Sequence, residues 1–317
     1  MKALILAAGL GTRLRPLTFI RAKASLPLLS VPFVRYSLQY LHLHQVEEIV
    51  INLHAHPDTV RKAAGTSYRG IPIHYSHEPE ILGTAGAIRK ALPMLNAEPF
   101  VVMNSDMLMY IPLAEAFEQH RREGSDVTLV IMREDRFSHY SSLFFEEFES
   151  GPPRFVGLQP GKGQRYHYTG LQIVNPDVAK LIPSDRKTEI FGEIYPNLLQ
   201  DKKIHGFVYD GFWMEIGTLK EYLQTSLDLH LQSLPVALQP PGVEPSLISP
   251  EAKVEQGAQV TNSIIMEGAV VRSGADVERC IIGWDVTVTR RIRNAVIVRG
   301  VLPWYILNER QLHEERL

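Results

Sequence analysis

The chain begins with Met1-Lys-Ala-Leu-Ile-Leu-Ala-Ala-Gly-Leu-Gly-Thr-Arg-Leu-Arg-Pro-Leu-Thr18. The apolar run Ala3–Ala8 is long enough for one buried strand, and it leads into a loop that contains Gly9, Gly11, Thr12 and Arg13. Small residues let backbone N–H groups approach a polyphosphate closely, and a guanidinium grips phosphate oxygens with parallel N–H bonds. The loop lacks the third glycine of a dinucleotide fingerprint and the Lys-Ser/Thr of a P-loop. It therefore predicts either a phosphate-binding loop of another kind or a plain glycine turn.

The composition is that of an ordinary globular protein. The 317 residues suffice for two domains, with 45% hydrophobic and 21% charged residues. A formal net charge of -2 gives no basic field for nucleic acid or an anionic membrane. The single Cys280 cannot form an internal disulfide, which fits a reducing compartment. No apolar run has the length of a signal-peptide core or the ~20 residues of a membrane span. We expect a cytoplasmic protein without nucleic-acid or membrane partners.

Residues 1–232 alternate short apolar runs with longer amphipathic ones. The expected strands are Ala3–Ala8, Glu48–Leu53, Ile73–Ser76, Phe100–Asn104, Val127–Met132, Tyr168–Val174 and Ile204–Tyr209. The expected helices are Val34–Gln45, Thr84–Leu92, Leu113–Glu123, Phe191–Leu199 and Leu219–Gln232. This alternation predicts an α/β fold, a Rossmann-like mixed sheet covered by helices. Ligands of such sheets bind at the carboxyl ends of the strands, where the loop after Ala8 and Asn104-Ser-Asp106 would lie.

The pattern changes after residue 232. Residues 233–246 are rich in proline, which suits a linker, and we place a third segment at 247–317. There, Val follows Gly by three residues in four places, at Gly257, Gly268, Gly274 and Gly283. This spacing resembles the hexapeptide repeat of a short left-handed parallel β-helix, for which we expect about three coils, and plain β-structure is the alternative. Such a tail also suggests a homo-oligomer assembled through the β-helix.

The string Gly-x-Gly-Thr-Arg-Leu-x-Pro-Leu-Thr of the first loop resembles the signature of the sugar-1-phosphate nucleotidyltransferases. Further motifs of that family follow in the expected order over residues 1–232. The resemblance implies that a sugar 1-phosphate oxygen attacks the α-phosphorus of a nucleoside triphosphate, giving a nucleotide sugar and pyrophosphate. The positions that match the family's nucleotide-binding residues are Leu6, Ala7, Ala8, Gly9, Gly11, Thr12, Arg13, Glu78, Gly83, Thr84 and Asn104.

The resemblance also assigns cations and metal ligands. Arg13 and Lys23 would neutralise phosphate charge, although Ala22 replaces the proline that usually precedes this lysine. Asp106, in the strand that ends Asn-Ser-Asp, is implied to bind Mg²⁺ together with Glu215. Glu215 stands in Gly211-Phe-Trp-Met-Glu-Ile-Gly217, where the family has Asp, so its carboxylate reaches one methylene further. We expect Arg13, Lys23 and Asp106 to carry catalysis.

The segment Ser76-His-Glu-Pro-Glu-Ile-Leu-Gly-Thr-Ala-Gly86 resembles that of mannose-1-phosphate guanylyltransferases. Gly83 would let a base lie against the backbone, and Glu78 takes the position of the base-reading side chain. A carboxylate can accept from both N1–H and N2–H₂ of guanine, whereas uracil offers only N3–H, so GTP is favoured. Some uridylyltransferases also carry Glu there, and UTP and dTTP stay open.

The sugar side departs from the family. The usual Glu-Lys-Pro is absent, and Lys162 or Arg165 could supply the missing charge unless both are solvated loop residues. Tyr168 and Gly170 match the strand beside the sugar, and Glu193 lies where acceptors of sugar hydroxyls occur. We expect mannose 1-phosphate or a related hexose or heptose phosphate as the acceptor.

Two other functions remain to be compared. The departures from the family favour a regulatory subunit that binds nucleotide sugars with little activity. An acyltransferase, which often uses a β-helix histidine, is disfavoured because no His occurs between residues 231 and 312. The pairs His42/His44 and His54/His56 lack the companion ligands of a zinc site.

Overall fold

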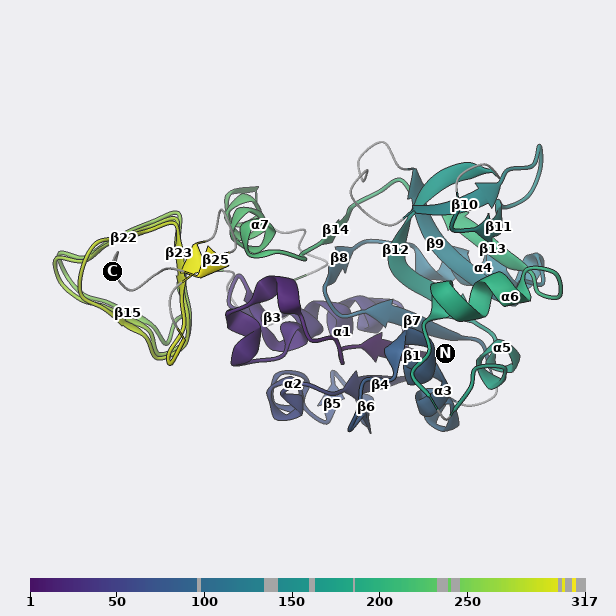
Figure 1. Ribbon diagram of the computed structural model, residues 1–317, viewed down its shortest axis with the longest axis horizontal. Helices are drawn as coiled ribbons and strands as arrows, with labels where there is room; N and C mark the ends of the chain where they lie inside the picture. The colour runs from purple at the N-terminus through teal and green to yellow at the C-terminus, as the bar shows by residue number, and fades with distance from the viewer. Residues whose placement is uncertain are drawn as a thin grey trace. The chain divides into compact units, whose positions relative to one another are not determined.

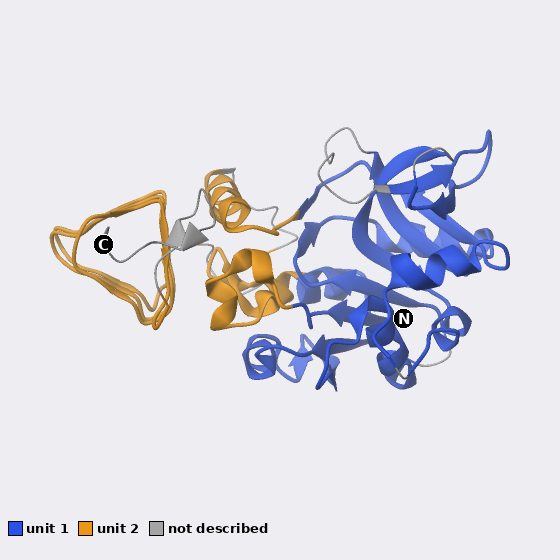
Figure 2. Ribbon diagram, in the orientation of Figure 1, with its two compact units in different colours: residues 1–9, 37–214 blue, residues 10–36, 215–317 orange. Residues whose placement is uncertain are grey.

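The computed structural model describes residues 1–95, 98–133, 142–159, 163–184, 186–232, 239–240, 246–301, 304–305 and 310–311. Most of the predicted linker, 233–238 and 241–245, lies outside these described residues. The chain forms two compact units, one of residues 1–9 and 37–214 and the other of residues 10–36 and 215–317 (Figure 2). The loop segment 10–36 therefore belongs to the same unit as the C-terminal third of the chain.

A mixed sheet of ten strands forms the centre of the first unit, in the order β10-β11-β13-β9-β12-β7-β1-β4-β6-β5 (Figure 1). The strands are β1 Lys2–Leu6, β4 Glu48–Leu53, β5 Ser67–Tyr68, β6 Ile71–His77, β7 Phe100–Asn104, β9 Val127–Arg133, β10 Ser142–Glu146, β11 Arg154–Gly157, β12 Gln164–Val174 and β13 Ile204–Val208. Strands β7, β1, β4 and β6 are parallel neighbours, whereas β12 runs antiparallel to β7 and β9. The predicted mixed α/β sheet is confirmed.

Strand β1 is shorter at its carboxyl end than the sequence predicts. Ala3, Leu4 and Ile5 are fully buried, as befits a strand with a parallel neighbour on each side. The expected strand Ala3–Ala8 was wrong at its end, because the strand stops at Leu6. The N–H of Ala7 donates to the side chain of Asn52 on β4 rather than to a backbone carbonyl of a neighbouring strand. Ala7 and Ala8 thus belong to the loop.

Helices of the first unit cover this sheet. They are α2 Pro57–Ala64, α3 Gly83–Leu95, α4 Leu113–Arg122, α5 Pro176–Lys180, the π-turn η5 Ile190–Ile194 and α6 Tyr195–Leu198, and α1 Phe33–Leu43 contributes residues to both units. Buried side chains of α3, α5, η5 and α6 share one apolar core with β1, β7 and β9. The predicted helix Phe191–Leu199 was wrong as a single element. Pro196 has no N–H to continue an α-helix and lies instead in the first turn of α6.

A short ribbon pairs β8 Met107–Met109 with β14 Trp213–Glu215. In the second unit, the segment 10–36 contains the 3₁₀ turns η1 Thr12–Leu14, η2 Leu17–Phe19 and η3 Lys23–Ser25 and the hairpin β2 Pro27–Leu28 with β3 Val31–Pro32. Helix α7 spans Leu219–Gln232, as predicted. It begins with a capping box, in which the Glu221 carboxylate accepts the Thr218 N–H and the Thr218 hydroxyl accepts the Glu221 N–H.

The C-terminal strands build a parallel β-helix, which Figure 1 shows as a three-sided coil. Its three sheets are β15-β18-β21, β16-β19-β22 and β17-β20-β23, so each face holds three stacked rungs and the expected number of coils is confirmed. The strands are β15 Lys253–Val254, β16 Gln259–Thr261, β17 Ile264–Ile265, β18 Val270–Val271, β19 Asp276–Glu278, β20 Ile281–Ile282, β21 Thr287–Val288, β22 Ile292–Arg293 and β23 Ala295–Ile297. Beyond them, β24 Trp304–Tyr305 and β25 Arg310–Gln311 extend one sheet antiparallel.

Valine residues three positions after glycine point into the coil, as the repeat predicts. Val271, Val277 and Val286 are buried, whereas Val260 of the first coil is half-buried. Val254 pairs with Val271, which pairs with Val288, but Val277 pairs with Ile292 across a shorter interval. The coils are therefore unequal in length. In the described part of the chain, no helix is both long and apolar enough to cross a bilayer.

The first-unit core provides a test of the packing. Phe145 is fully buried, with its ring centroid 5.5 Å from those of Phe155 and Tyr166. We expect Phe145→Ala to lower the free energy of unfolding by about 3–5 kcal/mol, because it leaves a cavity. Phe148→Ala is the matched control, since Phe148 is 50% exposed and should change stability by less than about 1 kcal/mol. Denaturant titration measures both, and equal losses would contradict this description of the core.

Candidate active site

The predicted site residues are divided between the two units. The first unit carries Leu6, Ala7, Ala8, Gly9, Glu78, Gly83, Thr84, Asn104, Asp106, Tyr168, Gly170 and Glu193. The second unit carries Gly11, Thr12, Arg13, Lys23 and Glu215. The glycine loop itself crosses from one unit to the other between Gly9 and Leu10.

In the first unit, the sheet brings several predicted residues to one edge. Strands β7, β1, β4 and β6 are parallel, so their carboxyl ends meet there. These strands end at Asn104, Leu6, Leu53 and His77, so Glu78 directly follows the last of them. The Ser105 N–H donates to the Leu6 carbonyl at 3.2 Å, which holds the segment before Asp106 beside the end of β1. Asp106 is half-buried there.

Glu78 is almost fully enclosed by protein. It is 1% exposed, and both carboxylate oxygens have hydrogen-bond partners. Oε1 accepts from Asn52 Nδ2 at 2.8 Å, and Oε2 accepts from the Leu82 N–H at 3.1 Å. Asn52 was not predicted as a site residue. The available signal was an amide near the end of the otherwise apolar strand Glu48–Leu53.

The start of α3 is packed against residues 188–189. Gly83 has φ +72°, and a Cβ there would lie 2.6 Å from the Thr188 carbonyl oxygen. The Thr84 N–H donates to Glu189 Oε2 at 3.3 Å, and the Ala85 N–H donates to the Thr188 oxygen at 3.1 Å. A glycine is therefore required at position 83, both by the backbone angle and by the close carbonyl.

The structure brings Gly170, which was predicted for the sugar, next to Asn104, which was predicted for the nucleotide. Gly170 of β12 has φ +85°, and a Cβ there would lie 2.8 Å from Asn104 Nδ2 at the end of β7. The Tyr168 ring packs edge-on against Phe191, with 4.9 Å between centroids, and burial raises the pKa of its hydroxyl. Tyr168 is thus a neutral side chain in an aromatic setting.

The remaining sugar-side residues are less enclosed. Glu193 accepts hydrogen bonds from Arg186 and from the Glu189 N–H, and the Arg186 guanidinium lowers the pKa of its carboxyl. Arg165 is an exposed residue of β12. Lys162, the other candidate for the missing charge, lies outside the described residues.

In the second unit, the glycine loop folds back on the segment that carries Lys23. Gly11 has φ +59°, and a Cβ there would lie 2.8 Å from Thr18 Cγ2 and 3.2 Å from Lys23 Cβ. The Thr18 hydroxyl donates to the Gly11 carbonyl at 2.9 Å. Two residues that the sequence predicted for the triphosphate, Gly11 and Lys23, are therefore neighbours.

Arg13 lies against the segment Glu215–Gly217. Its Nη2 is 3.4 Å from Glu215 Oε1, and a Cβ on Gly217 would lie 2.9 Å from its Nη1. The Gly217 N–H is in turn held by the Glu221 carboxylate at 3.0 Å. The structure thus pairs the predicted phosphate cation with a predicted metal carboxylate.

The donor chemistry fits Mg²⁺. Asp106 and Glu215 are hard oxygen donors, and Mg²⁺ in proteins is usually held by one or two carboxylates, waters and substrate phosphates. Among the described residues, no group of three or more His, Cys, Asp or Glu side chains is arranged to hold a metal ion. A metal bound by either carboxylate would therefore need further oxygens, from water or from a bound phosphate.

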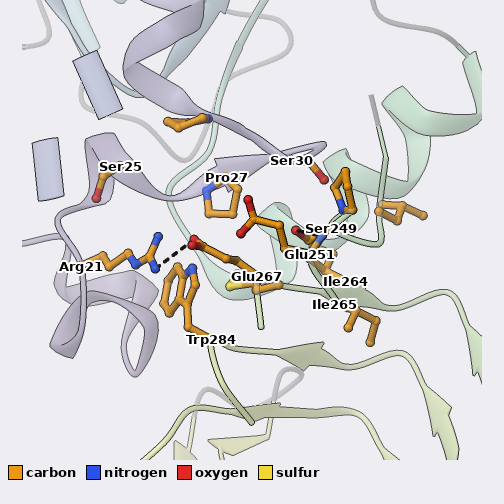
Figure 3. A pocket seen from close by; sticks show the side chains of 14 residues that line it. Arg21, Ser25, Pro27, Ser30, Ser249, Glu251, Ile264, Ile265, Glu267 and Trp284 are labelled. Carbon is orange, nitrogen blue, oxygen red and sulfur yellow. Dashed lines mark hydrogen bonds and ion pairs between the residues drawn. The ribbon is translucent and has the colours of Figure 1, made fainter. Parts of the chain in front are cut away.

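A second contact ties the segment before Lys23 to the β-helix. Arg21 lies over the ring of Trp284, 4.3 Å from its centroid, and forms an ion pair with Glu267 at 3.2 Å (Figure 3). Both partners belong to the β-helix, and the three side chains line a cavity of about 250 Å³ together with Glu251. Cation–π and ionic contacts therefore hold Arg21 in place.

Comparison with known proteins identifies the family. Residues 2–232 match the model of the nucleotidyl transferase family, and residues 233–298 match the model of the GlmU-like C-terminal hexapeptide region. The chain therefore belongs to the nucleotidyl transferase family and carries a hexapeptide β-helix.

Similar curated proteins include mannose-1-phosphate guanylyltransferases. The catalytic subunit beta of that enzyme from Drosophila melanogaster is 30% identical, over 92% of this chain and 86% of its own. The mannose-1-phosphate guanyltransferase of Emericella nidulans is 31% identical, over 94% and 91%.

Solved structures share the fold of the chain. HddC from Yersinia pseudotuberculosis, complexed with GMP-PN, has a TM-score of 0.61 and 21% identity, over 72% of this chain and 99% of its own. A putative glucose-1-phosphate thymidylyltransferase from Bacillus anthracis has a TM-score of 0.63 and 20% identity, over 75% and 98%.

The place of Arg13 can be tested through Gly217. We expect Gly217→Ala to lower kcat/KM for the triphosphate by about 10-fold or more, because the new methyl group displaces the guanidinium. Folding should be unaffected, since the displaced group is the end of a flexible side chain. Gly192→Ala is the control, because the nearest atom to its Cβ lies 3.9 Å away. Equal kinetics for the two variants would show that Arg13 does not need this position.

Proposed function

We propose that the protein transfers a guanylyl group from GTP to mannose 1-phosphate, giving GDP-mannose and pyrophosphate. A phosphate oxygen of mannose 1-phosphate bonds to the α-phosphorus of GTP. The bond between that phosphorus and the oxygen that bridges the α- and β-phosphates breaks, and this oxygen leaves with pyrophosphate. The observation that carries the proposal is the glycine loop, in which Gly11 lies against Lys23 and Arg13 belongs to the same unit. The family of the chain supports the reaction class.

The residues would act through charge and position. Nucleotidyl transfer needs little covalent help, so preorganised charges at the phosphates account for most of the rate. We assign Arg13 and Lys23 to the triphosphate, with Gly11 allowing its phosphates to approach the backbone. Asp106 and Glu215 would hold Mg²⁺, which when bound supplies further neutralisation of phosphate charge.

The choice of GTP and mannose 1-phosphate rests on the similar proteins. Guanylyltransferases named for mannose 1-phosphate match over more than nine-tenths of the chain. The motif Ser76–Gly86, which resembles that of mannose-1-phosphate guanylyltransferases, is a further likeness to these proteins. Gly170, which lies beside Asn104, and Tyr168 are proposed to face the sugar.

A second candidate is a regulatory subunit that binds nucleotide sugars with little activity. The ion pair between Arg13 and Glu215 favours it, because that contact engages one phosphate cation and one metal carboxylate with each other. Three departures from the family pattern also favour this candidate. They are Ala22 in place of proline, Glu215 in place of aspartate, and the absence of Glu-Lys-Pro.

Replacing Asp106 tests the metal assignment. We expect Asp106→Ala to lower the rate of pyrophosphate release by at least about 100-fold, because one preorganised charge of the reaction centre is lost. Asp177→Ala is the control, since Asp177 is an exposed residue of α5 paired with Lys180. An Asp106→Ala enzyme with wild-type activity would refute the assignment.

A substrate panel tests the reaction itself. Pyrophosphate release is measured with GTP, UTP, ATP and dTTP, each with several hexose and heptose 1-phosphates, in the presence and absence of Mg²⁺. We expect the highest kcat/KM for GTP with mannose 1-phosphate, and only with Mg²⁺. Binding of a nucleotide sugar without turnover of any pair would instead support the regulatory subunit.

A further inference from the structure

Three strand ends of the first unit are joined by one chain of buried hydrogen bonds. Strand β4 lies between β1 and β6, with Asn52 opposite Leu6 on one side and Ser76 on the other. Asn52 is 3% exposed. Its Oδ1 accepts the Ala7 N–H at 2.6 Å, and its Nδ2 donates to Glu78 Oε1 at 2.8 Å. The Glu78 carboxylate in turn accepts the Leu82 N–H. We call the four residues joined in this way, Ala7, Asn52, Glu78 and Leu82, the relay.

The relay joins the two backbone segments predicted to enclose the nucleotide. At one end, Ala7 opens the loop that continues into Gly9. At the other end, Leu82 immediately precedes Gly83, whose backbone was predicted to lie against the base. The backbone of Glu78 is also anchored, because its N–H donates to the Leu53 carbonyl at 2.7 Å and its carbonyl lies 2.8 Å from His54 Nδ1.

The chemistry of the relay requires an amide at position 52. A backbone N–H only donates and a carboxylate only accepts, so the residue between them must present one acceptor and one donor. An aspartate at position 52 would set two carboxylates against each other. An aliphatic residue would leave the Ala7 N–H and one Glu78 oxygen buried without partners.

We infer that Asn52 is a positioning residue for the nucleotide site, and that Glu78 acts with it to align Ala7–Gly9 and Leu82–Gly83. This rests on the proposed function, and it revises the base-reading role that the sequence predicted for Glu78. With both oxygens bonded inside the protein and 1% exposure, the Glu78 carboxylate supports the walls of the base pocket rather than contacting the base. Discrimination between bases then falls to the aligned backbone.

Two single variants and their combination test the inference. In Glu78→Gln, the new side chain can accept from only one of its two donors, and in Asn52→Asp two carboxylates face each other. The double variant that combines Asn52→Asp with Glu78→Gln restores the pattern. The carboxylate introduced at position 52 accepts from the Ala7 N–H and from the amide introduced at position 78. The oxygen of that amide accepts from the Leu82 N–H.

We expect each single variant to lower kcat/KM by about 10-fold or more for GTP and for UTP alike, since a hydrogen bond to a charged group is lost. The ratio between the two triphosphates should change by less than about threefold, and the double variant should recover most of the activity. Thr128→Val is the matched control. It removes a buried hydrogen bond, to His120 Nδ1 at 2.9 Å, from strand β9, and should lower stability without changing the kinetics.

Two results would overturn the inference. If Glu78→Gln lowers kcat/KM for GTP at least about 10-fold more than for UTP, Glu78 reads the base. A double variant no more active than the single variants would show that the relay does not position the site. If the wild-type protein turns over no substrate pair, the proposed function fails, and unfolding midpoints decide the relay. The double variant must then regain the stability that each single variant loses.

Discussion

The structure of the first unit depends on the burial of β1 between two parallel neighbours. Ala3, Leu4 and Ile5 lose all contact with solvent, and their backbone groups are paired with β4 on one side and β7 on the other. Parallel strands end at a common edge, so this arrangement alone brings the loop after β1 next to the segments after β4, β6 and β7. Asn52 therefore contacts Ala7 at the start of the glycine loop, although the two are far apart in sequence. Glu78 and Asp106 follow strands that end at the same edge.

At this edge, the Glu78 carboxylate and the Asn52 amide each have two hydrogen-bond partners inside the protein, which makes the edge rigid. Buried polar groups are costly unless each is hydrogen-bonded, and here Asn52 and Glu78 satisfy each other and two backbone N–H groups. The same bonds end β1 at Leu6. One small network thus sets both the length of the central strand and the start of the loop that we propose to bind phosphate.

In the second unit, a few specific contacts hold the segments that carry Arg13 and Lys23. Gly11 and Gly217 leave room for their neighbours, a capping box holds the Gly217 backbone, and Arg21 is bound by Trp284 and Glu267. Through its contacts with Arg21, the β-helix therefore stabilises the segment that also contains Lys23, two residues after Arg21.

Much of this was determined by the sequence alone. The apolar runs of β4 and β7 and the periodicity of α7 predicted those elements with the correct bounds, because strong local patterns leave few alternatives. The glycine loop and the Gly-x-x-Val repeat predicted the family and the β-helix. The end of β1, the pairing of Arg13 with Glu215 and the enclosure of Glu78 were decided only by tertiary structure. Each depends on a partner that is distant in the chain, or on which of several hydrogen bonds forms. Residue type and spacing alone do not determine which partner is chosen.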